Sequence, residues 1–450
     1  MFNLAETQKM FAEKDIKFFL MSFVDMHGAP RAKLVPAECL ADVMDGAAGF
    51  AGFAVDGLGQ GPHDPDLSCV PQTDSTVFPL PWKPGVAWIA GNLQSGAGDD
   101  WHFCPRVLLS RALADARAKG FSLKTGVEPE FFLVEKKPDR TLGVADAADT
   151  LAKPCYGQLS LLRNADFLMT LITHLNELGY GVYQNDHEDA NGQFEINWRF
   201  GDALKTADQV SFFKFMVKAL AEERGLCATF MPKPFADLTG SGAHHHLSLW
   251  DAEGKDNLFL DKSDPRGLSS LALSFMAGIL AHAKGLCALT APSVNSYKRF
   301  GARSPRSGAT WAPVFIAHGG NNRTLMVRVP APGRIEYRTA DGAANPYLAA
   351  VGLLAAGLDG VERGLRPGEA QNDNLFLLSP REARARGIEL LPSNLGEALD
   401  ALEQDDLLCS ALGTEYAQHY LEVKREEWDD YAEMTAKSVT AWEIGRYLGL

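Results

Sequence analysis

The spacing of apolar residues in the first hundred positions predicts one helix followed by short strands and long turns. Residues 4–20 have the apolar spacing of a short amphipathic helix, and residues 18–25 alternate as a strand does. A glycine-rich passage, 46–61, leads into loops rich in proline and aspartate that reach about residue 84. This pattern predicts a small α+β domain over residues 1–104.

The remaining residues, 105–450, predict a larger domain in which strands and helices alternate. Its last third is helical, first over residues 346–363 and then from 395 to about 447. Gly364 is a stop signal for the first of these segments, and Ser393 is a start signal for the second. A chain of 450 residues is long enough for two such domains, each with its own core.

Residues 186–197, with the sequence Asp-His-Glu-Asp-Ala-Asn-Gly-Gln-Phe-Glu-Ile-Asn, carry the strongest local signal in the chain. Asn191-Gly192 favours a two-residue hairpin turn in which both residues have positive φ. Such a turn places Glu188 directly opposite Glu195, where like charges destabilise a sheet. Two explanations are open: the glutamates splay into solvent, or a cation lies between them.

Other segments place charged or histidine side chains on one strand face, because residues at i and i+2 share a face. Each segment alone has an ordinary explanation, such as a polar strand end or a surface ion-pair ladder that contributes little. Pro129, between two glutamates, predicts an edge or a strand start at the rim of a cleft. The residues concerned are Glu128 and Glu130; His244, His246 and Ser248; Arg323 and Arg328; and Arg334, Glu336 and Arg338.

As ligands, five carboxylates and one imidazole from these strands suit Mg²⁺ or Mn²⁺ rather than a thiolate-bound metal. Six side-chain ligands would serve two ions with three ligands each. Arginines beside such ions are typical of sites where phosphoryl charge develops. The chain has no P-loop motif, and the glycines at 57, 59 and 61 lack the spacing of a dinucleotide-binding loop. An EF-hand is excluded because the glycine of 186–197 falls at the wrong position.

Composition limits the remaining classes of function. The chain is 46% hydrophobic and 22% charged, which is typical of a globular protein, and its formal net charge of −14 argues against nucleic-acid binding. The longest apolar stretch, 275–292, is interrupted by His282 and Lys284, so no membrane span is expected. Charged residues in the first turns exclude a signal peptide. Seven scattered cysteines form no disulfide framework, and these features together predict a cytoplasmic protein.

The order of these strand motifs resembles the glutamine synthetase superfamily over nearly the whole chain. One such motif alone would not be specific, whereas the full ordered set is. The matching segments are 126–132 (Gly-Val-Glu-Pro-Glu-Phe-Phe), 187–195, 228–234, 240–248 (Gly-Ser-Gly-Ala-His-His-His-Leu-Ser), 295–299, 322–324, 334–338 (Arg-Ile-Glu-Tyr-Arg) and 345–348 (Asn-Pro-Tyr-Leu).

The resemblance implies a small N-terminal β-grasp domain and a large catalytic domain whose antiparallel strands form an open active-site barrel surrounded by helices. It implies a dodecamer of two hexameric rings with active sites between neighbouring subunits. Members make γ-glutamyl phosphate from L-glutamate and ATP, and an amine then attacks this intermediate.

The resemblance also implies a role for individual residues. One metal ion would bind Glu130, Glu188 and Glu195. The other would bind Glu128, His244 and Glu336. The further implied roles are glutamate binding for Arg299, Arg338 and Gly240; nucleotide contact for His246, Ser248 and Arg334; stabilisation of the transferred phosphoryl group for Arg323 and Arg328; deprotonation of the amine by Asp56 of a neighbouring subunit; and a border of the amine pocket for Tyr156.

The chain departs from ammonia-using members at three positions. Their flap ends in Glu-Ala-Pro, whereas residues 307–313 read Ser-Gly-Ala-Thr-Trp-Ala-Pro, so Trp311 replaces the glutamate. This change removes an attraction for a bare cation and adds an apolar wall for an alkyl group, with a possible cation–π contact. Thr239 replaces a common asparagine, which leaves the contact to the glutamate amino group open. Phe376 replaces the tyrosine that some bacterial members adenylylate, so that regulation is excluded.

Segments 307–313, 186–195 and 49–53 (Gly-Phe-Ala-Gly-Phe) together most resemble the branch of the family that makes γ-glutamylmethylamide. The resemblance therefore implies ATP-dependent ligation of methylamine to glutamate. A type III-like glutamine synthetase that uses ammonia and a γ-glutamylpolyamine synthetase are alternatives with the same mechanism. A non-catalytic relative is a further alternative, but it predicts eroded metal ligands, and all six are present.

Overall fold

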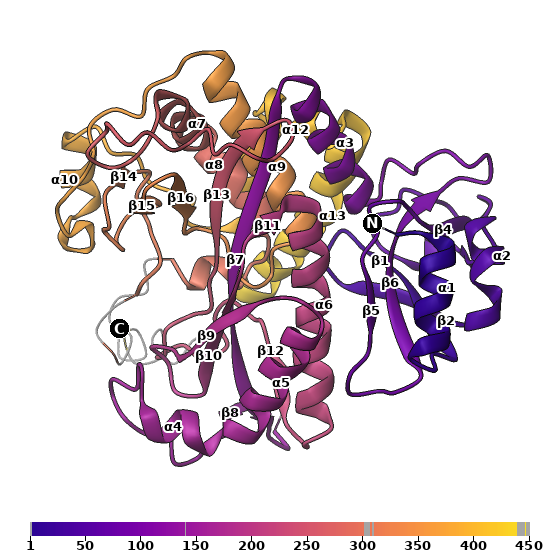
Figure 1. Cartoon of the computed structure of the whole chain (residues 1–450). Helices are drawn as coiled ribbons and strands as arrows, with labels where there is room; N and C mark the ends of the chain where they lie inside the picture. The colour runs from indigo at the N-terminus through magenta and orange to yellow at the C-terminus, as the bar shows by residue number, and fades with distance from the viewer. Residues whose placement is uncertain (1, 140, 301–306, 308–309, 439–445, 447–450) are drawn as a thin grey trace.

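The computed structural model of the chain describes residues 2–139, 141–300, 307, 310–438 and 446. They form a small N-terminal domain around a six-stranded sheet and a larger domain around a ten-stranded sheet (Figure 1). The predicted α+β class is confirmed. The predicted boundary at residue 104 lies between the last strand of the small sheet and the first helix of the larger domain, and it stays a prediction.

The small sheet has the strand order β2-β1-β6-β4-β3, with β5 also paired to β6. Strands β1 and β6 are parallel, and the other pairs are antiparallel. The predicted helix over 4–20 is too long, because Asp15 turns the chain with a φ of 53° before β1 begins. The elements are α1 (Leu4–Glu13), β1 (Phe18–Val24), β2 (Pro30–Pro36), η1 (Ala37–Cys39), α2 (Leu40–Met44), β3 (Gly49–Phe50), η2 (Gly52–Ala54), β4 (Leu67–Pro71), β5 (Val77–Pro79) and β6 (Val86–Gln94).

The larger sheet has the order β14-β15-β16-β13-β7-β10-β9, and β8, β11 and β12 pair with β7. The pairs are antiparallel except for β14 with β15. The strands are β7 (Phe121–Lys136), β8 (Leu142–Val144), β9 (Val182–His187), β10 (Gln193–Trp198), β11 (Gly201–Asp202), β12 (Cys227–Thr229), β13 (Ala243–Asp251), β14 (His318–Gly319), β15 (Val327–Ala331) and β16 (Arg334–Tyr337).

The helices of this domain cover the sheet and fill its main core. They are α3 (Pro105–Ala118), α4 (Gln158–Arg163), α5 (Ala165–Glu177), α6 (Ala203–Glu222), α7 (Ser270–Ala281), α8 (Ala283–Thr290), η3 (Ser296–Lys298), α9 (Pro346–Glu362), η4 (Leu375–Leu377), α10 (Pro380–Ala385), α11 (Leu395–Glu403), α12 (Asp406–Leu412) and α13 (Thr414–Ala436). The helical segment predicted from 395 to about 447 is thus three helices, and residues 439–445 and 447 lie outside the described part of the chain.

Strand β7 runs through the middle of the larger domain (Figure 1). Residues 121–129 pair with β13, and residues 130–132 pair with β10. The prediction that Pro129 marks an edge or a strand start is therefore wrong. A proline is tolerated inside this central strand because Pro129 lies where the pairing passes from β13 to β10.

Helices α7 and α9 pack closely in the core because glycines face each other at their crossing. A Cβ atom on Gly278 would lie 2.0 Å from the carbonyl oxygen of Ala356, and one on Gly360 would lie 2.1 Å from that of Ser274.

No single helix among the described residues is long and apolar enough to cross a membrane. Helices α7 and α8 pass that test only as a pair, and they meet at a bend of 78°.

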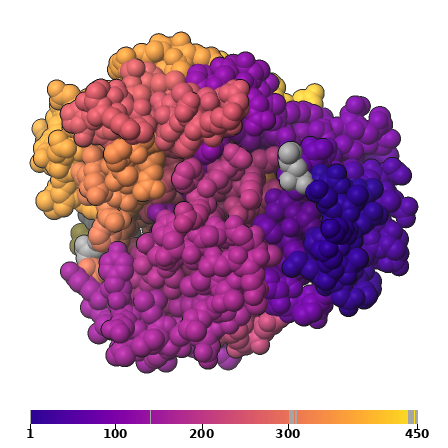
Figure 2. All heavy atoms as spheres, in the orientation of Figure 1, coloured from indigo at the N-terminus to yellow at the C-terminus, as the bar shows by residue number. Residues whose placement is uncertain are grey.

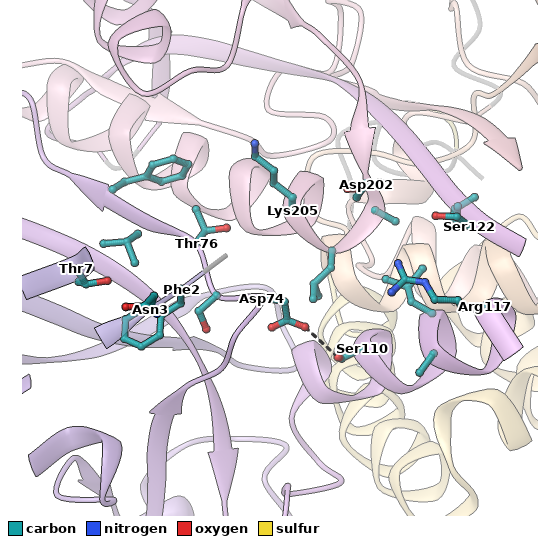
Figure 3. A pocket seen from close by; sticks show the side chains of 18 of the residues that line it. Phe2, Asn3, Thr7, Asp74, Thr76, Ser110, Arg117, Ser122, Asp202 and Lys205 are labelled. Atoms are coloured by element: carbon teal, nitrogen blue, oxygen red, sulfur yellow. Dashed lines mark hydrogen bonds between the residues drawn. The ribbon is translucent and has the colours of Figure 1, made fainter. Parts of the chain in front are cut away.

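The two domains contact each other through a buried ionic network. Arg106 of α3 donates to Asp208 of α6 (3.0 Å) and to Asp74 of the N-terminal domain (3.0 Å). Beside this network lies a cavity of about 770 Å³, with Asp74 and Ser110 in its wall (Figure 3). The indigo N-terminal domain packs against the larger domain on this side (Figure 2). Strand β7 contributes Ser122 and Leu123 to its lining, but none of the predicted site residues lines this cavity.

Candidate active site

A small cavity of about 160 Å³ brings together most of the residues singled out in the sequence. Strands β7, β9, β10 and β13 and the loops that follow β9 and precede β13 form its acidic wall. A second wall comes from the segment that contains Trp311 and from the arginine-bearing region around β15 and β16. The predicted site residues that line it are Glu128, Glu130, Tyr156, Glu188, Glu195, Gly240, His244, Arg299, Trp311, Arg323, Arg328 and Arg338.

The hairpin at 186–197 differs from its prediction. Glu195 pairs with Asp186, not with Glu188, and a connection of five residues, 188–192, joins the two strands. Of Asn191 and Gly192, only the glycine has positive φ (73°). The reason is tertiary: the side chain of Asn191 and the backbone N–H of Gly192 donate to a buried carboxylate elsewhere in the chain, described below.

Backbone pairing places the carboxylates and the imidazole next to one another. Glu130 of β7 pairs with Glu195 of β10, and Glu128 pairs with His244 of β13. The Nδ1 atom of His244 lies 3.8 Å from Glu128 Oε2 and 3.7 Å from Glu336 Oε1.

Among the described residues, three groups of histidine and carboxylate side chains have ligand atoms within 4.8 Å of one another. Glu128, His244 and Glu336 form one group, as the resemblance implied. The other predicted trio is not a group by itself. Glu195 instead connects two groups, one with Glu130 and His244 and one with Glu188 and Asp186. Sequence reasoning missed Asp186, although its i, i+2 spacing to Glu188 was a usable signal.

The electrostatics of these groups fit a divalent cation. Burial and the charge of Glu130 raise the pKa of Glu188 to about 8. Burial and the charges of Glu128 and Glu188 raise the pKa of Glu195 well above its ordinary value. Burial also raises the pKa of Glu130 to about 6, although the hydrogen bond from the Gly242 N–H lowers it. Carboxylates crowded in this way favour a bound cation, and the oxygen and imidazole donors suit Mg²⁺ or Mn²⁺.

Glu336 and Glu128 already have donor partners that favour their charged forms. Burial would raise the pKa of Glu336, but Arg338 and His244 outweigh it and lower the pKa to about 2. Arg338 Nη1 lies 2.6 Å from Glu336 Oε1, and Arg328 Nε lies 2.5 Å from Oε2. Burial likewise opposes the charge of Glu128, but its pKa is well below the ordinary value because His244 and His246 donate to it.

Trp311 and Tyr156 have backbone conformations that are rare for side-chain-bearing residues. Their φ angles are 53° and 62°, and they are two of the three described non-glycine residues with positive φ. The carbonyl of Trp311 accepts from Arg338 Nη2 (3.1 Å), and the N–H of Tyr156 donates to the carbonyl of His187 (2.9 Å). Strained residues held by their surroundings are typical of functional sites.

Thr239, which replaces a common asparagine, joins two segments of the wall. Its hydroxyl donates to Asp189 Oδ2 (2.5 Å), and the hydroxyl of Ser307 donates to the same oxygen. Residues 308 and 309 of the predicted flap lie outside the described part of the chain. Asp189 is a further residue that sequence reasoning did not single out.

Five predicted site residues do not line this cavity, and one of them, Glu336, still shares a ligand group with Glu128 and His244. Asp56 belongs to the N-terminal domain, where its carboxylate is 78% exposed and lies 3.7 Å from His27. His246 contacts Glu128 (3.0 Å) from the neighbouring position on β13. Ser248 accepts a hydrogen bond from Trp250 (2.9 Å), and Arg334 is exposed. One subunit alone therefore does not bring Asp56 to the acidic cluster.

Comparison with known proteins connects this site to a family. The family described as glutamine synthetase, catalytic domain, matches residues 102–447. The chain belongs to the glutamine synthetase family. This confirms the resemblance found in the order of the strand motifs, and it accounts for a site made of carboxylates, one imidazole and several arginines.

Relatives within the glutamine synthetase family differ in their names. A glutamine synthetase of Rhizobium leguminosarum bv. phaseoli is 47% identical and covers 96% of each chain. A glutamate–methylamine ligase of Methyloversatilis universalis is 46% identical and covers 99% of each chain. A solved structure of GmaS in complex with ADP superposes with a TM-score of 0.91 at 48% identity and covers both chains fully.

The raised carboxylate pKa values predict how the metal-free protein responds to pH. Glu188 titrates near pH 8 in the folded protein and near 4.5 ordinarily, so its contribution to stability is lost as pH rises through about 8. We therefore expect the chelated protein to have a lower melting temperature at about pH 8.5 than at about pH 6. Circular dichroism melts with EDTA or Mn²⁺ measure this, and Mn²⁺ should reduce the difference. The variant Glu188→Gln should show a smaller pH effect; equal melting temperatures at both pH values in the wild type would contradict the prediction.

Proposed function

We propose that this protein is an ATP-dependent ligase that joins methylamine to the γ-carboxylate of L-glutamate. The products are γ-glutamylmethylamide, ADP and phosphate. The observation that carries the proposal is Trp311, an aromatic wall beside the acidic cluster where ammonia-using relatives have a carboxylate. The similarity to a glutamate–methylamine ligase over 99% of both chains supports it.

We propose that two divalent ions, Mg²⁺ or Mn²⁺, bind the acidic strands. Glu130, Glu188 and Glu195 would hold one ion, with Asp186 beside them. Glu128, His244 and Glu336 would hold the other. Such ions neutralise phosphate charge and orient the transferred group. The protein's own contribution is a set of ligands fixed on paired strands, so that little reorganisation is needed when the ions bind.

The remaining charged residues fit the two halves of the reaction. In the first half, the γ-carboxylate oxygen of glutamate attacks the γ-phosphorus of ATP and ADP leaves. Arg299, Arg338 and the Gly240 backbone would bind glutamate, and Arg323 and Arg328 would stabilise the transferred phosphoryl group. The nucleotide would contact His246, Ser248 and Arg334.

In the second half, the amine nitrogen attacks the acyl carbon and phosphate leaves. Methylammonium must first lose a proton, so the reaction requires a base. We assign this role to Asp56 of a neighbouring subunit, because its own subunit leaves it exposed and away from the acidic cluster. This assignment requires an oligomer with sites between subunits, and a dodecamer of two hexameric rings is the proposed form.

Trp311 and Tyr156 line the same cavity as Glu188 and would form the amine pocket. An indole ring contacts a methyl group favourably and attracts a cation through its face. A carboxylate at the same position would instead favour the small, strongly hydrated ammonium ion. The chemistry of the wall therefore favours an alkylated amine.

An amine profile tests the proposed function. Initial rates of phosphate release are measured with glutamate, ATP and Mg²⁺ or Mn²⁺, and with methylamine, ammonium, ethylamine or a polyamine as the varied substrate. We expect methylamine to have the highest kcat/KM, with γ-glutamylmethylamide identified by mass spectrometry. A kcat/KM for ammonium equal to or above that for methylamine would reject methylamine in favour of glutamine synthesis. No activity with any amine would favour a non-catalytic relative.

A further inference from the structure

A buried aspartate outside the predicted site holds the loop that carries Glu188. Asp149 lies between β8 and α4, and its carboxylate is buried. Its Oδ2 atom accepts from the His187 ring (2.7 Å) and from the Gly192 backbone N–H (2.8 Å). Its Oδ1 atom accepts from Asn191 Nδ2 (3.1 Å) and from the Ser160 hydroxyl (3.3 Å).

These four hydrogen bonds satisfy the carboxylate fully and clamp both ends of the 188–192 connection. The clamp explains why Asn191-Gly192 does not form a two-residue turn. A Cβ atom at position 192 would also lie 2.7 Å from the side chain of Val144, so the loop has no room to shift. Burial opposes a charged carboxylate, but the donors from His187, Asn191 and Gly192 lower the pKa of Asp149 to about 2.

The clamp extends to the amine side of the cavity through His187. One nitrogen of its ring contacts Asp149, and the other lies 2.9 Å from the carbonyl oxygen of Glu188. The backbone carbonyl of His187 accepts from the N–H of Tyr156, whose φ is 62°. Glu188 and Tyr156 therefore both contact His187, Glu188 through the ring and Tyr156 through the backbone carbonyl.

We propose that Asp149 is a positioning residue that fixes the positions of both the metal ligand Glu188 and the amine-pocket residue Tyr156. This role rests on the proposed function. Asp149 does not line the cavity and belongs to none of the ligand groups. It acts through the His187 ring and the 188–192 loop. Groups that orient metal ligands in this way typically change metal affinity by about 10–100-fold when they are removed.

The variant Asp149→Asn tests the proposal because it keeps the side-chain shape. An amide has one acceptor oxygen, so its NH₂ group must face either the Gly192 N–H or the Asn191 NH₂ group, and both of these are donors only. We expect Mn²⁺ affinity to fall about 10-fold. Titration of the full-length, substrate-free protein with Mn²⁺, followed by electron paramagnetic resonance, measures it. We also expect the KM for the amine to rise more than kcat falls.

Asp146→Asn is the matched control, because Asp146 lies in the same segment but pairs with Arg163 (2.7 Å) rather than with the loop. It should leave Mn²⁺ affinity unchanged. If Asp149→Asn lowers only the melting temperature and keeps the wild-type Mn²⁺ affinity, the residue is merely structural and the proposal is wrong.

If Asp149→Asn does not fold, Asn191→Ala replaces it as the test, because it removes one of the four bonds. A smaller loss of Mn²⁺ affinity supports the proposal, and unchanged affinity overturns it. Mn²⁺ binding is measured without any amine. If methylamine is not the substrate, the amine profile shows this and the Mn²⁺ affinities do not change.

Discussion

Replacing Glu188 with alanine is expected to reduce glutamate-dependent phosphate release by on the order of 10²–10³-fold, the typical cost of losing one group that stabilises transition-state charge. Glu188 lies with Asp186 and Glu195 in one group of potential ligands, and the loop that carries it is clamped at both ends. The loss should therefore fall on kcat as well as on the apparent affinity for Mn²⁺.

The same change should not destabilise the metal-free protein. Burial and the charge of Glu130 make an ionised Glu188 unfavourable, as its pKa of about 8 shows. Removing it relieves repulsion, so the melting temperature in EDTA at about pH 8.5 should stay equal or rise. Activity and stability would then change in opposite directions, which separates a metal-ligand role from a folding defect.

The control for this experiment is Glu135→Ala, since Glu135 is an exposed glutamate on the same strand as Glu128 and Glu130. It should retain wild-type phosphate release. Wild-type activity in Glu188→Ala would refute the metal assignment. A large loss in both variants would indicate general damage to the strand and its neighbours instead.

Replacing Trp311 with glutamate is expected to lower the preference for methylamine over ammonia by roughly 10- to 10²-fold, the range that one added or missing methylene group can supply. The change removes the aromatic wall and restores the carboxylate found in ammonia-using relatives. The backbone should tolerate it. Glutamate bears the same φ of 53° at a cost similar to that of tryptophan, and the hydrogen bond from Arg338 goes to the carbonyl of residue 311.

The measured quantity is the ratio of kcat/KM for methylamine to that for ammonium, at fixed glutamate and ATP. Trp311→Phe keeps an aromatic wall and should hold this ratio close to the wild-type value. An unchanged ratio in Trp311→Glu would show that Trp311 does not select the amine. A loss of activity with both amines would place the residue in glutamate or nucleotide binding.

Alternation along strands predicted much of the site. The i, i+2 spacing of Glu128 and Glu130, and of His244 and His246, is a local property of extended backbone, so it survives in any sheet that contains these strands. Pairing of Glu128 with His244 and of Glu130 with Glu195 then follows from the fold. The side-chain types alone indicated a divalent cation and phosphoryl chemistry.

Two local signals gave wrong predictions because distant residues changed their outcome. Asn191-Gly192 favours a tight turn, but the Asn191 side chain and the Gly192 N–H donate to the carboxylate of Asp149 instead, and the connection is longer. Pro129 favours an edge, but a change of partner strand accommodates it in the central strand β7. Both contacts join segments that lie far apart in the chain, and no local pattern records them.

The sequence by itself determined which chemistry this protein can support, because the type of ligand residue and its spacing along a strand are properties of short segments. The tertiary structure alone decided which carboxylates share a ligand group, that Asp189 joins Thr239 to Ser307, and that Asp149 accepts hydrogen bonds from the 188–192 loop. Those features depend on where buried donors and acceptors meet. A buried carboxylate must be satisfied by whichever groups the fold brings to it.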